Sequence, residues 1–202
     1  MGFLRKKIVI TGCLAERYKA EILEELPEVD AVVGLGNNGN IADIVSEVLD
    51  AETPIVAIGE RENLPLCGER LLTTPDYWGY LKIADGCSNH CTYCAIPSIR
   101  GEMRSRPIEE CVEEAKALAA DGIKELIVIA QDTTRYGEDL YGEPKLHELL
   151  PKLCEIDGLE WIRILYCYPD RLSDELIDVI AREDKICKYI DLPLQHCNKE
   201  VL

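Results

Sequence analysis

Three cysteines stand close together near the middle of the chain, at Cys87, Cys91 and Cys94. Their spacing is C-x3-C-x2-C, and the residues between them are polar or aromatic. Thiolates are the soft ligands that iron–sulfur clusters require. Three thiolates on one short loop can hold three corners of a 4Fe-4S cluster and leave the fourth iron open to an outside ligand. The spacing therefore favours an iron–sulfur site.

A structural zinc ion is the alternative for these cysteines. Such a site takes four protein ligands in a tetrahedron, so a fourth side chain must join the three thiolates. His90 and Cys67 are the candidates, although His90 sits inside the cysteine loop and is poorly placed to close the same site. This interpretation predicts a non-enzymatic, zinc-stabilised interaction module.

Composition restricts the remaining possibilities. The 202 residues are 47% hydrophobic and carry a net charge of −16, which disfavours a general nucleic-acid binder. Residues 1–7 precede a short strand-like run and no long apolar stretch, so neither a signal peptide nor a membrane span is expected. We expect a cytoplasmic protein with reduced thiols. Five other cysteines do not stand at ligand spacing and are expected to be small core residues: Cys111, Cys154, Cys167, Cys187 and Cys197.

The elements that position the cysteine loop follow an alternating pattern. Residues 1–60 predict strands at 7–11, 29–33 and 55–58, with helices at 16–26 and 41–49. Residues 61–76 contain Gly and Pro with several charges and predict a linker. The first part of the chain is therefore expected to be an α/β layer structure.

Residues 77–202 predict a second series of strand–helix units. The predicted strands are 80–84, 125–130, 161–166 and 189–194, and the predicted helices are 108–120, 146–156 and 172–182, with Ser173 as an N-cap. Four such units imply parallel strands, as in a β/α barrel, and no helix follows the fourth strand. The cysteine loop follows the first strand at its carboxyl end, where barrel active sites are built.

The cysteine loop and its surroundings resemble a known family. C-x3-C-x-aromatic-C after the first barrel strand resembles the signature of the radical S-adenosylmethionine (SAM) superfamily. The segments that resemble its methylthiotransferases are Tyr80–Gly101 and Arg104–Pro107. Three more segments resemble the branch that modifies an aspartate of a small-subunit ribosomal protein (S-twelve): Ile129–Thr134 with Tyr136-Gly137, Arg163–Pro169 and Tyr189–His196. The tRNA-modifying branch is similar but differs in these three segments.

The resemblance covers residues 7–202 and implies a fold and an activity. The implied fold is α/β: a truncated Rossmann-like N-terminal domain, followed by the first four β/α units of a partial radical SAM barrel. The implied activity is addition of a methylthio group to the aspartate β-carbon through a 5′-deoxyadenosyl radical. Implied partners are the ribosomal protein or ribosome and an electron donor such as flavodoxin or ferredoxin. A tRNA adenosine substrate is the alternative.

The resemblance also assigns cofactor ligands. Cys87, Cys91 and Cys94 are the implied ligands of the radical SAM cluster. Cys13, just past the first predicted strand, is the implied third ligand of an auxiliary 4Fe-4S cluster. The two partners of Cys13 lie upstream in the family, so we expect this chain to be an internal fragment of an enzyme with two clusters.

The resemblance also implies roles near SAM for residues other than the cysteines. Tyr93 is expected beside the cluster, or else as an ordinary half-buried aromatic residue. Gln131 and Asp132 end the second barrel strand, where the superfamily receives the substrate amino group, and an ammonium needs acceptors. Asp132 is equally expected as a helix cap. A basic cluster able to bind a carboxylate is expected from Arg100, Arg104 and Arg106. His196 has either an active-site or a capping role.

One further motif suggests a different function. Gly34, Gly36 and Gly39 fit G-x-G-x-x-G after a predicted strand, and Glu60 follows the next strand. This pattern is typical of dinucleotide binding, but a glycine-rich turn ahead of a helix explains it as well. The short preceding strand and the distance to Glu60 favour the turn.

Overall fold

The computed structural model describes residues 6–61, 64–68, 71–73, 75–194, 196 and 198–201. They form two compact units. The first contains the chain up to Gly68 together with Asn89–Gly101, and the second contains Glu69–Ser88 together with Glu102 onward. The predicted linker, 61–76, spans the point where the chain passes from the first unit to the second. None of the described helices is long and apolar enough to cross a membrane.

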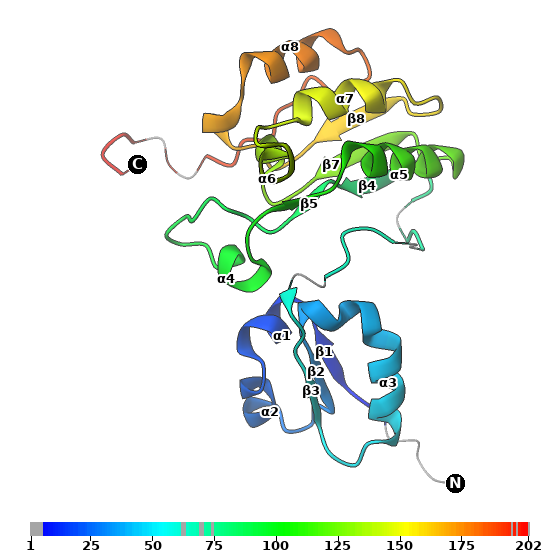
Figure 1. Cartoon of the computed structure of the whole chain (residues 1–202), viewed down its shortest axis with the longest axis vertical. Coiled ribbons are helices and arrows are strands. Elements are labelled where there is room, and N and C mark those ends of the chain that lie inside the picture. The colour runs from blue at the N-terminus through cyan, green and yellow to red at the C-terminus, as the bar shows by residue number, and fades with distance from the viewer. Residues whose placement is uncertain are drawn as a thin grey trace. The chain divides into compact units, whose positions relative to one another are not determined.

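The first unit is built on a three-stranded parallel sheet of β1 (Val9–Thr11), β2 (Ala31–Val33) and β3 (Ile55–Ala57), in that order. The central strand β2 is buried on both faces, as a continuous apolar run in a parallel sheet requires. Val32 packs with the helices α1 (Cys13–Tyr18) and α2 (Glu21–Glu25). Ala31 and Val33 pack with α3 (Ile41–Asp50) on the opposite face (Figure 1). The predicted α/β layers are confirmed.

The predicted helix over 16–26 is wrong in its continuity. It is two short helices, α1 and α2, and the first begins at Cys13. The break falls at Lys19, whose φ of 49° lies in the left-handed region and cannot continue a right-handed helix. The apolar spacing of the segment is preserved across the break, so periodicity alone did not reveal it.

The glycine motif forms a 3-10 helix, Leu35–Asn40, in which packing explains Gly36. A Cβ atom on Gly36 would lie 2.1 Å from the backbone oxygen of Glu60. The buried carboxylate of Glu16 accepts the Leu35 N–H at 2.9 Å, so a protein anion already occupies this backbone donor. These contacts support the glycine-rich turn over the dinucleotide site.

Replacing Gly36 by alanine is expected to destabilise the first unit by about 2 kcal/mol or more, because the new methyl group meets backbone that cannot turn aside. Hydrogen exchange of the β2 amides measures this change within the first unit. Gly39→Ala is the matched control, since its Cβ would meet only Pro65, at 3.5 Å. Equal protection in the two variants would show that the close approach to Glu60 carries no cost.

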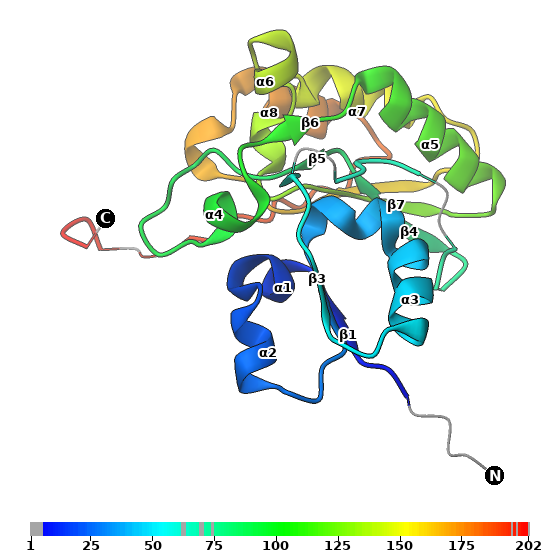
Figure 2. The same cartoon turned by 60° about the horizontal axis from the view of Figure 1, so that its bottom comes forward.

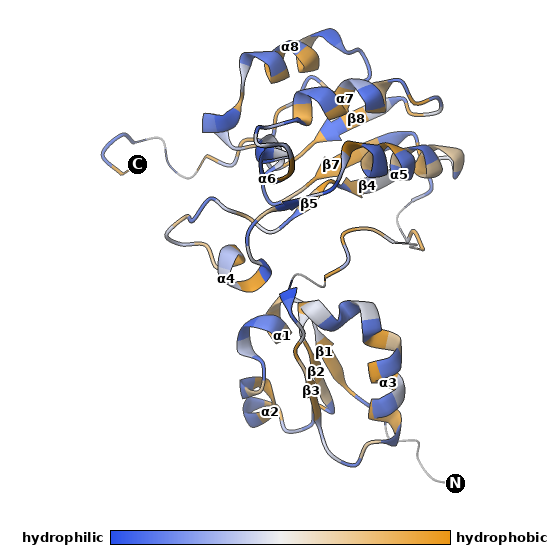
Figure 3. Cartoon of the chain, in the orientation of Figure 1, coloured by the Kyte–Doolittle hydropathy of each residue, from blue (hydrophilic) through white to orange (hydrophobic). Residues whose placement is uncertain are grey.

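The second unit contains a parallel sheet of β4 (Trp78–Lys82), β7 (Glu125–Ile129) and β8 (Trp161–Ile164). Alternate residues of these strands, such as Leu81, Leu126 and Ile162, are fully buried. They pack in one core with α5 (Ile108–Ala120), α7 (Leu146–Cys154) and α8 (Asp174–Arg182) (Figure 2). In Figure 3 the hydrophobic residues of these strands, which supply this core, are coloured orange. Three parallel β/α units are thus present as predicted.

Several local predictions hold in this unit. Helix α5 covers the predicted residues 108–120 without change. Ser173 caps α8, because its hydroxyl accepts the Leu176 N–H at 3.2 Å. Both features depend on residues adjacent in sequence, which explains why sequence patterns found them.

The predicted fourth strand, 189–194, is absent. The segment after α8 contacts β8 through one parallel bridge, Ile162 with Ile186. Beyond the end of β8, the Asp191 carbonyl accepts the Cys167 N–H at 2.9 Å. Between these points Tyr189 bonds locally to Cys187, and Pro193 has no N–H to offer a ladder. The β4–β7–β8 sheet therefore has three strands, and the fourth β/α unit is a correction to the expected fold.

A short antiparallel pair brackets the cysteine loop. β5 (Ala84–Asp85) pairs with β6 (Arg104–Ser105) in the second unit. The intervening chain holds the three cysteines, followed by α4 (Ile96–Arg100). The loop begins after β5 and ends before β6, so both of its ends are held by the same pairing.

Candidate functional site

Asp85, which is only 1% exposed, anchors the start of the cysteine loop. One carboxylate oxygen accepts the Gly86 N–H at 2.8 Å, and the other pairs with the Lys82 ammonium at 3.1 Å. Gly86 has a φ of 78°, which favours glycine because a side chain is strained there. Asp85 and Gly86 together turn the chain from β5 into the loop.

The three cysteines of the loop are half-buried. The Cys94 N–H bonds to the Cys91 carbonyl at 3.0 Å and forms a turn between these two cysteines. The Ile96 N–H points at the Cys94 sulfur, at 3.4 Å. Backbone N–H donors of this kind stabilise thiolate ligands and tune iron–sulfur clusters. The loop therefore supplies one donor suited to a cluster-bound sulfur.

The cysteine loop is judged as a metal site by its donor set. Within the described part of the chain, no group of three His, Cys, Asp or Glu side chains is arranged to hold one. The two candidates for a fourth zinc ligand, His90 and Cys67, are exposed. The fit to a 4Fe-4S cluster thus depends on the donor set: three half-buried thiols on one loop, with an N–H donor at Cys94.

Gln131 and Asp132 follow β7 at its carboxyl end and differ in their bonding. Asp132 is 2% exposed and caps the 3-10 helix Thr133–Arg135, accepting the Thr134 N–H at 3.0 Å and its hydroxyl at 2.5 Å. The Gln131 side-chain oxygen is buried and has no hydrogen-bond partner among the residues that the structure describes. A buried acceptor without a donor is costly, so this oxygen fits a site that an external donor completes. An ammonium group is such a donor.

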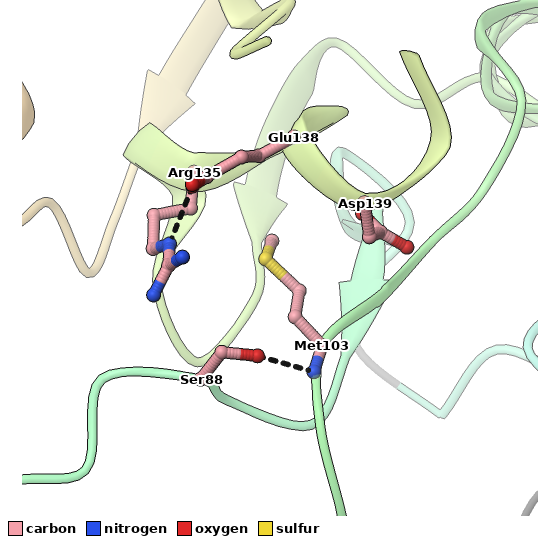
Figure 4. Close-up of a pocket in the computed structure, with 5 residues that line it drawn as sticks. All are labelled: Ser88, Met103, Arg135, Glu138 and Asp139. Carbon is pink, nitrogen blue, oxygen red and sulfur yellow. Dashed lines mark hydrogen bonds and ion pairs between the residues drawn. The ribbon is translucent and has the colours of Figure 1, made fainter. Parts of the chain in front are cut away.

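A cavity of about 250 Å³ lies between the start of the cysteine loop and the segment that follows β7 (Figure 4). Its lining residues are Ser88, Met103, Arg135, Glu138 and Asp139. The Ser88 hydroxyl accepts the Met103 N–H at 3.1 Å, and this holds the residue after Cys87 against the strand that returns from the loop. The cavity is therefore formed by the beginning of the cysteine loop and by residues after β7.

The acidic residues of the cavity are held by specific partners. Glu138 and Asp139 belong to α6 (Glu138–Tyr141). Asp139 accepts the Ser105 N–H at 2.8 Å and the Ser105 hydroxyl at 2.5 Å, which ties α6 to β6. Arg135 pairs with Glu138 at 2.6 Å. This ion pair fixes the orientation of both side chains at the cavity wall.

The Arg135–Glu138 pair also sets the charge of the cavity. Its hydrogen bond raises the pKa of Arg135, and the charges of Asp132 and Cys87 add smaller contributions. The same bond lowers the pKa of Glu138 below the usual carboxyl range. Arg135 therefore stays a cation at the cavity wall. The sequence analysis missed Arg135, Glu138 and Asp139, although they continue the segment that begins at Gln131.

The family of this chain follows from comparison with known proteins. The family model described as "Radical SAM superfamily" matches residues 81–202. This chain belongs to the radical SAM superfamily. The loop of Cys87, Cys91 and Cys94 lies inside the matched region, and so do β7 and β8.

Curated relatives are similar to this chain along nearly all of its length. The "Ribosomal protein uS12 methylthiotransferase RimO" of Desulforamulus reducens is 50% identical over 202 residues, covering 98% of this chain and 45% of that protein. The protein of the same name from Lachnoclostridium phytofermentans is 52% identical over 197 residues, with the same shares. The chain thus spans about half the length of these relatives.

A solved structure shares the fold at low identity. It is the radical S-adenosylmethionine methyltransferase TsrM from Kitasatospora setae, with tryptophan substrate and a SAM analogue bound. The TM-score is 0.67 at 15% identity, over 96% of this chain and 42% of that one. This likeness supports the partial radical SAM fold alone.

The predicted auxiliary ligand lies in the first unit of the radical SAM chain. Cys13 opens α1 and is half-buried. A guanidinium nitrogen of Arg100, on α4, donates to the Cys13 sulfur at 3.3 Å. The structure thereby brings together Cys13 and Arg100, which are 87 residues apart in sequence.

The predicted basic cluster is wrong for Arg106. Its residue is 2% exposed, and its guanidinium bonds to the Lys82 carbonyl at 2.9 Å and to Glu114 at 2.5 Å. A buried arginine paired in this way is structural and has no access to a substrate carboxylate. Tyr93, in contrast, is 66% exposed, so it is not the half-buried aromatic of the alternative interpretation.

The remaining cysteines of the radical SAM chain are mostly in or against the core. Cys111 and Cys167 are buried, and Cys154 packs against the same core. Burial raises the pKa of both Cys111 and Cys154 to about 11, so these thiols stay protonated at neutral pH. Cys187 is half-buried, and Cys197 lies outside the described residues. His196 is exposed and accepts the Asn198 N–H through Nδ1.

Proposed function

We propose that this chain is part of a radical SAM methylthiotransferase that adds a methylthio group to the β-carbon of an aspartate in the small-subunit ribosomal protein uS12. The observation that carries the proposal is about 50% identity, along 98% of the chain, to proteins named for this activity. The three branch segments between Ile129 and His196 support the ribosomal protein over tRNA. The net charge of −16 points the same way, because it repels a phosphate backbone.

The cluster loop has a defined part in this proposal. Cys87, Cys91 and Cys94 would hold a 4Fe-4S cluster, and that cluster would supply the electron for the reductive cleavage of SAM. The Ile96 N–H stabilises the charge on the Cys94 sulfur. Asp85 and Gly86 orient the loop at the end of β5. Tyr93, exposed on the same loop, covers one side of bound SAM.

Gln131 and Asp132 have separate parts. The orphaned Gln131 oxygen accepts a hydrogen bond from the SAM ammonium, whereas Asp132 holds the turn that places Gln131. Cys13 is a ligand of a second 4Fe-4S cluster, and Arg100 positions its sulfur. The enzyme takes electrons from a low-potential donor such as flavodoxin or ferredoxin, and it works in the cytoplasm, where its substrate is made.

The test is anaerobic reconstitution of the protein, expressed at its full natural length, with iron and sulfide. A dithionite-reduced EPR signal that shifts when SAM is added supports an open iron at the loop. Mass spectrometry then follows a uS12 peptide that carries the target aspartate. Replacement of one hydrogen by a methylthio group supports the proposal. A colourless, zinc-loaded protein would support the interaction module instead, and modification of tRNA with no change in the peptide would support the tRNA branch.

A further inference from the structure

Tyr166 has a strained backbone at the carboxyl end of β8. Its φ is 61°, in the left-handed region, and only Lys19 and His90 share a positive φ among the described non-glycine residues. This region is unfavourable for a bulky side chain, and such outliers persist only where the surrounding structure holds them. Glycine is the residue that normally occupies such a position. A tyrosine here therefore calls for an explanation in terms of its side chain.

Hydrogen bonds from two directions hold this conformation. The Tyr166 N–H donates to the Asp191 carboxylate at 2.8 Å. The Tyr166 carbonyl accepts the Thr133 N–H at 3.0 Å and its hydroxyl at 3.2 Å. The Thr133 hydroxyl also bonds to the Leu165 carbonyl at 2.9 Å. The backbone of Tyr166 is thus clamped between the segment after β7 and the segment around Asp191.

The strain does not serve packing within the described structure. The Tyr166 residue is 49% exposed, whereas its neighbours Ile164 and Cys167 are buried. Thr133, which clamps Tyr166, directly follows Gln131 and Asp132, so the exposed ring stands at the same edge of the sheet as the orphaned Gln131 oxygen. The clamp therefore displays an aromatic ring beside the site that we assign to SAM.

The charges at this edge favour a polypeptide. The Asp191 carboxylate lies at the Tyr166 backbone N–H, and Asp170 follows Tyr166 by four residues in the sequence. The arginines Arg135 and Arg171 are both paired with Glu138. With a chain charge of −16, this edge attracts a basic polypeptide and repels RNA. An exposed tyrosine on a rigid backbone suits recognition of a peptide, because its ring buries a large area with little loss of freedom.

We propose that Tyr166 contacts the substrate: its ring packs against the polypeptide segment that carries the target aspartate and holds it next to SAM. This inference rests on the proposed function, which it deepens by naming a specificity-determining residue. The clamp from Thr133 and Asp191 has a positioning role, since it fixes where the ring points.

The experiment compares Tyr166→Gly with Tyr166→Phe in the reconstituted protein at its full natural length. Glycine suits the left-handed backbone and lacks the ring, so the melting temperature is expected to stay equal or to rise. The KM for the uS12 peptide is expected to rise about ten-fold. Phenylalanine keeps the ring and should leave the KM near that of the wild type. Tyr77→Ala, an exposed tyrosine before the amino end of β4, is the control and should not change the KM.

The outcomes separate this inference from the proposed function. A wild-type protein that modifies the peptide, with an unchanged KM in Tyr166→Gly, overturns the role of Tyr166 and leaves the proposed function standing. A lower melting temperature together with a lower kcat and an unchanged KM marks a structural residue and also overturns it. A wild-type protein that neither binds nor modifies the peptide refutes the proposed function, and the inference falls with it.

Discussion

Replacing Cys91 by alanine is expected to remove about four iron atoms from the reconstituted protein at its full natural length, which is the content of one cluster. A cubane needs all three thiolates of the loop, and the loop offers no other sulfur that can take the place of Cys91. SAM cleavage should be lost with the cluster. Iron and sulfide analysis, together with the amount of 5′-deoxyadenosine formed after reduction, measures both effects.

A second cysteine provides the control for this prediction. Cys154→Ala removes a thiol that packs against the core and whose pKa is raised to about 11 by burial, so it is no ligand candidate. This variant should keep its iron while losing some stability through the small cavity. Equal iron content in Cys91→Ala and Cys154→Ala would show that the loop does not bind the cluster.

Replacing Asp85 by alanine is expected to destabilise the second unit by about 2–3 kcal/mol. The carboxylate is buried and serves both the Gly86 N–H and the Lys82 ammonium, so its removal leaves a buried donor and weakens the start of the cysteine loop. Lys82 is one-third exposed and regains water, which limits the loss. Urea unfolding followed by the fluorescence of Trp78 and Trp161, both in this unit, gives the value.

Asp85→Asn separates the two roles of the carboxylate. The amide keeps an acceptor for Gly86 but loses the charge that faces Lys82, so about half of the destabilisation is expected. Iron retention should follow the hydrogen bond, being lower in Asp85→Ala than in Asp85→Asn. If both variants unfold within about 0.5 kcal/mol of the wild type, Asp85 does not anchor the loop.

The sequence by itself determined the features that depend on neighbouring residues. The cysteine spacing, the bounds of α5 and the Ser173 cap all follow from residues within one or two turns of each other. The parallel order of the strands also followed, because a helix between two strands leaves little choice of direction. The cysteine motif that carries the resemblance to the radical SAM superfamily belongs here too, since its three cysteines lie in one continuous loop.

The tertiary structure decided what depends on residues far apart in the chain. Arg106 is buried because Glu114 and the Lys82 carbonyl take its donors, and Gly36 is required because Glu60 passes next to it.

The candidate site divides in the same way. The cysteines were visible in the sequence, but the cavity lined by Arg135 and Glu138, the orphaned oxygen of Gln131 and the clamp on Tyr166 were not. Each arises where the ends of different strands meet, so its hydrogen bonds join segments that are about 25 to 35 residues apart. Residue spacing along the chain carries no record of those contacts, because they are set by how the strands pair and where each one ends.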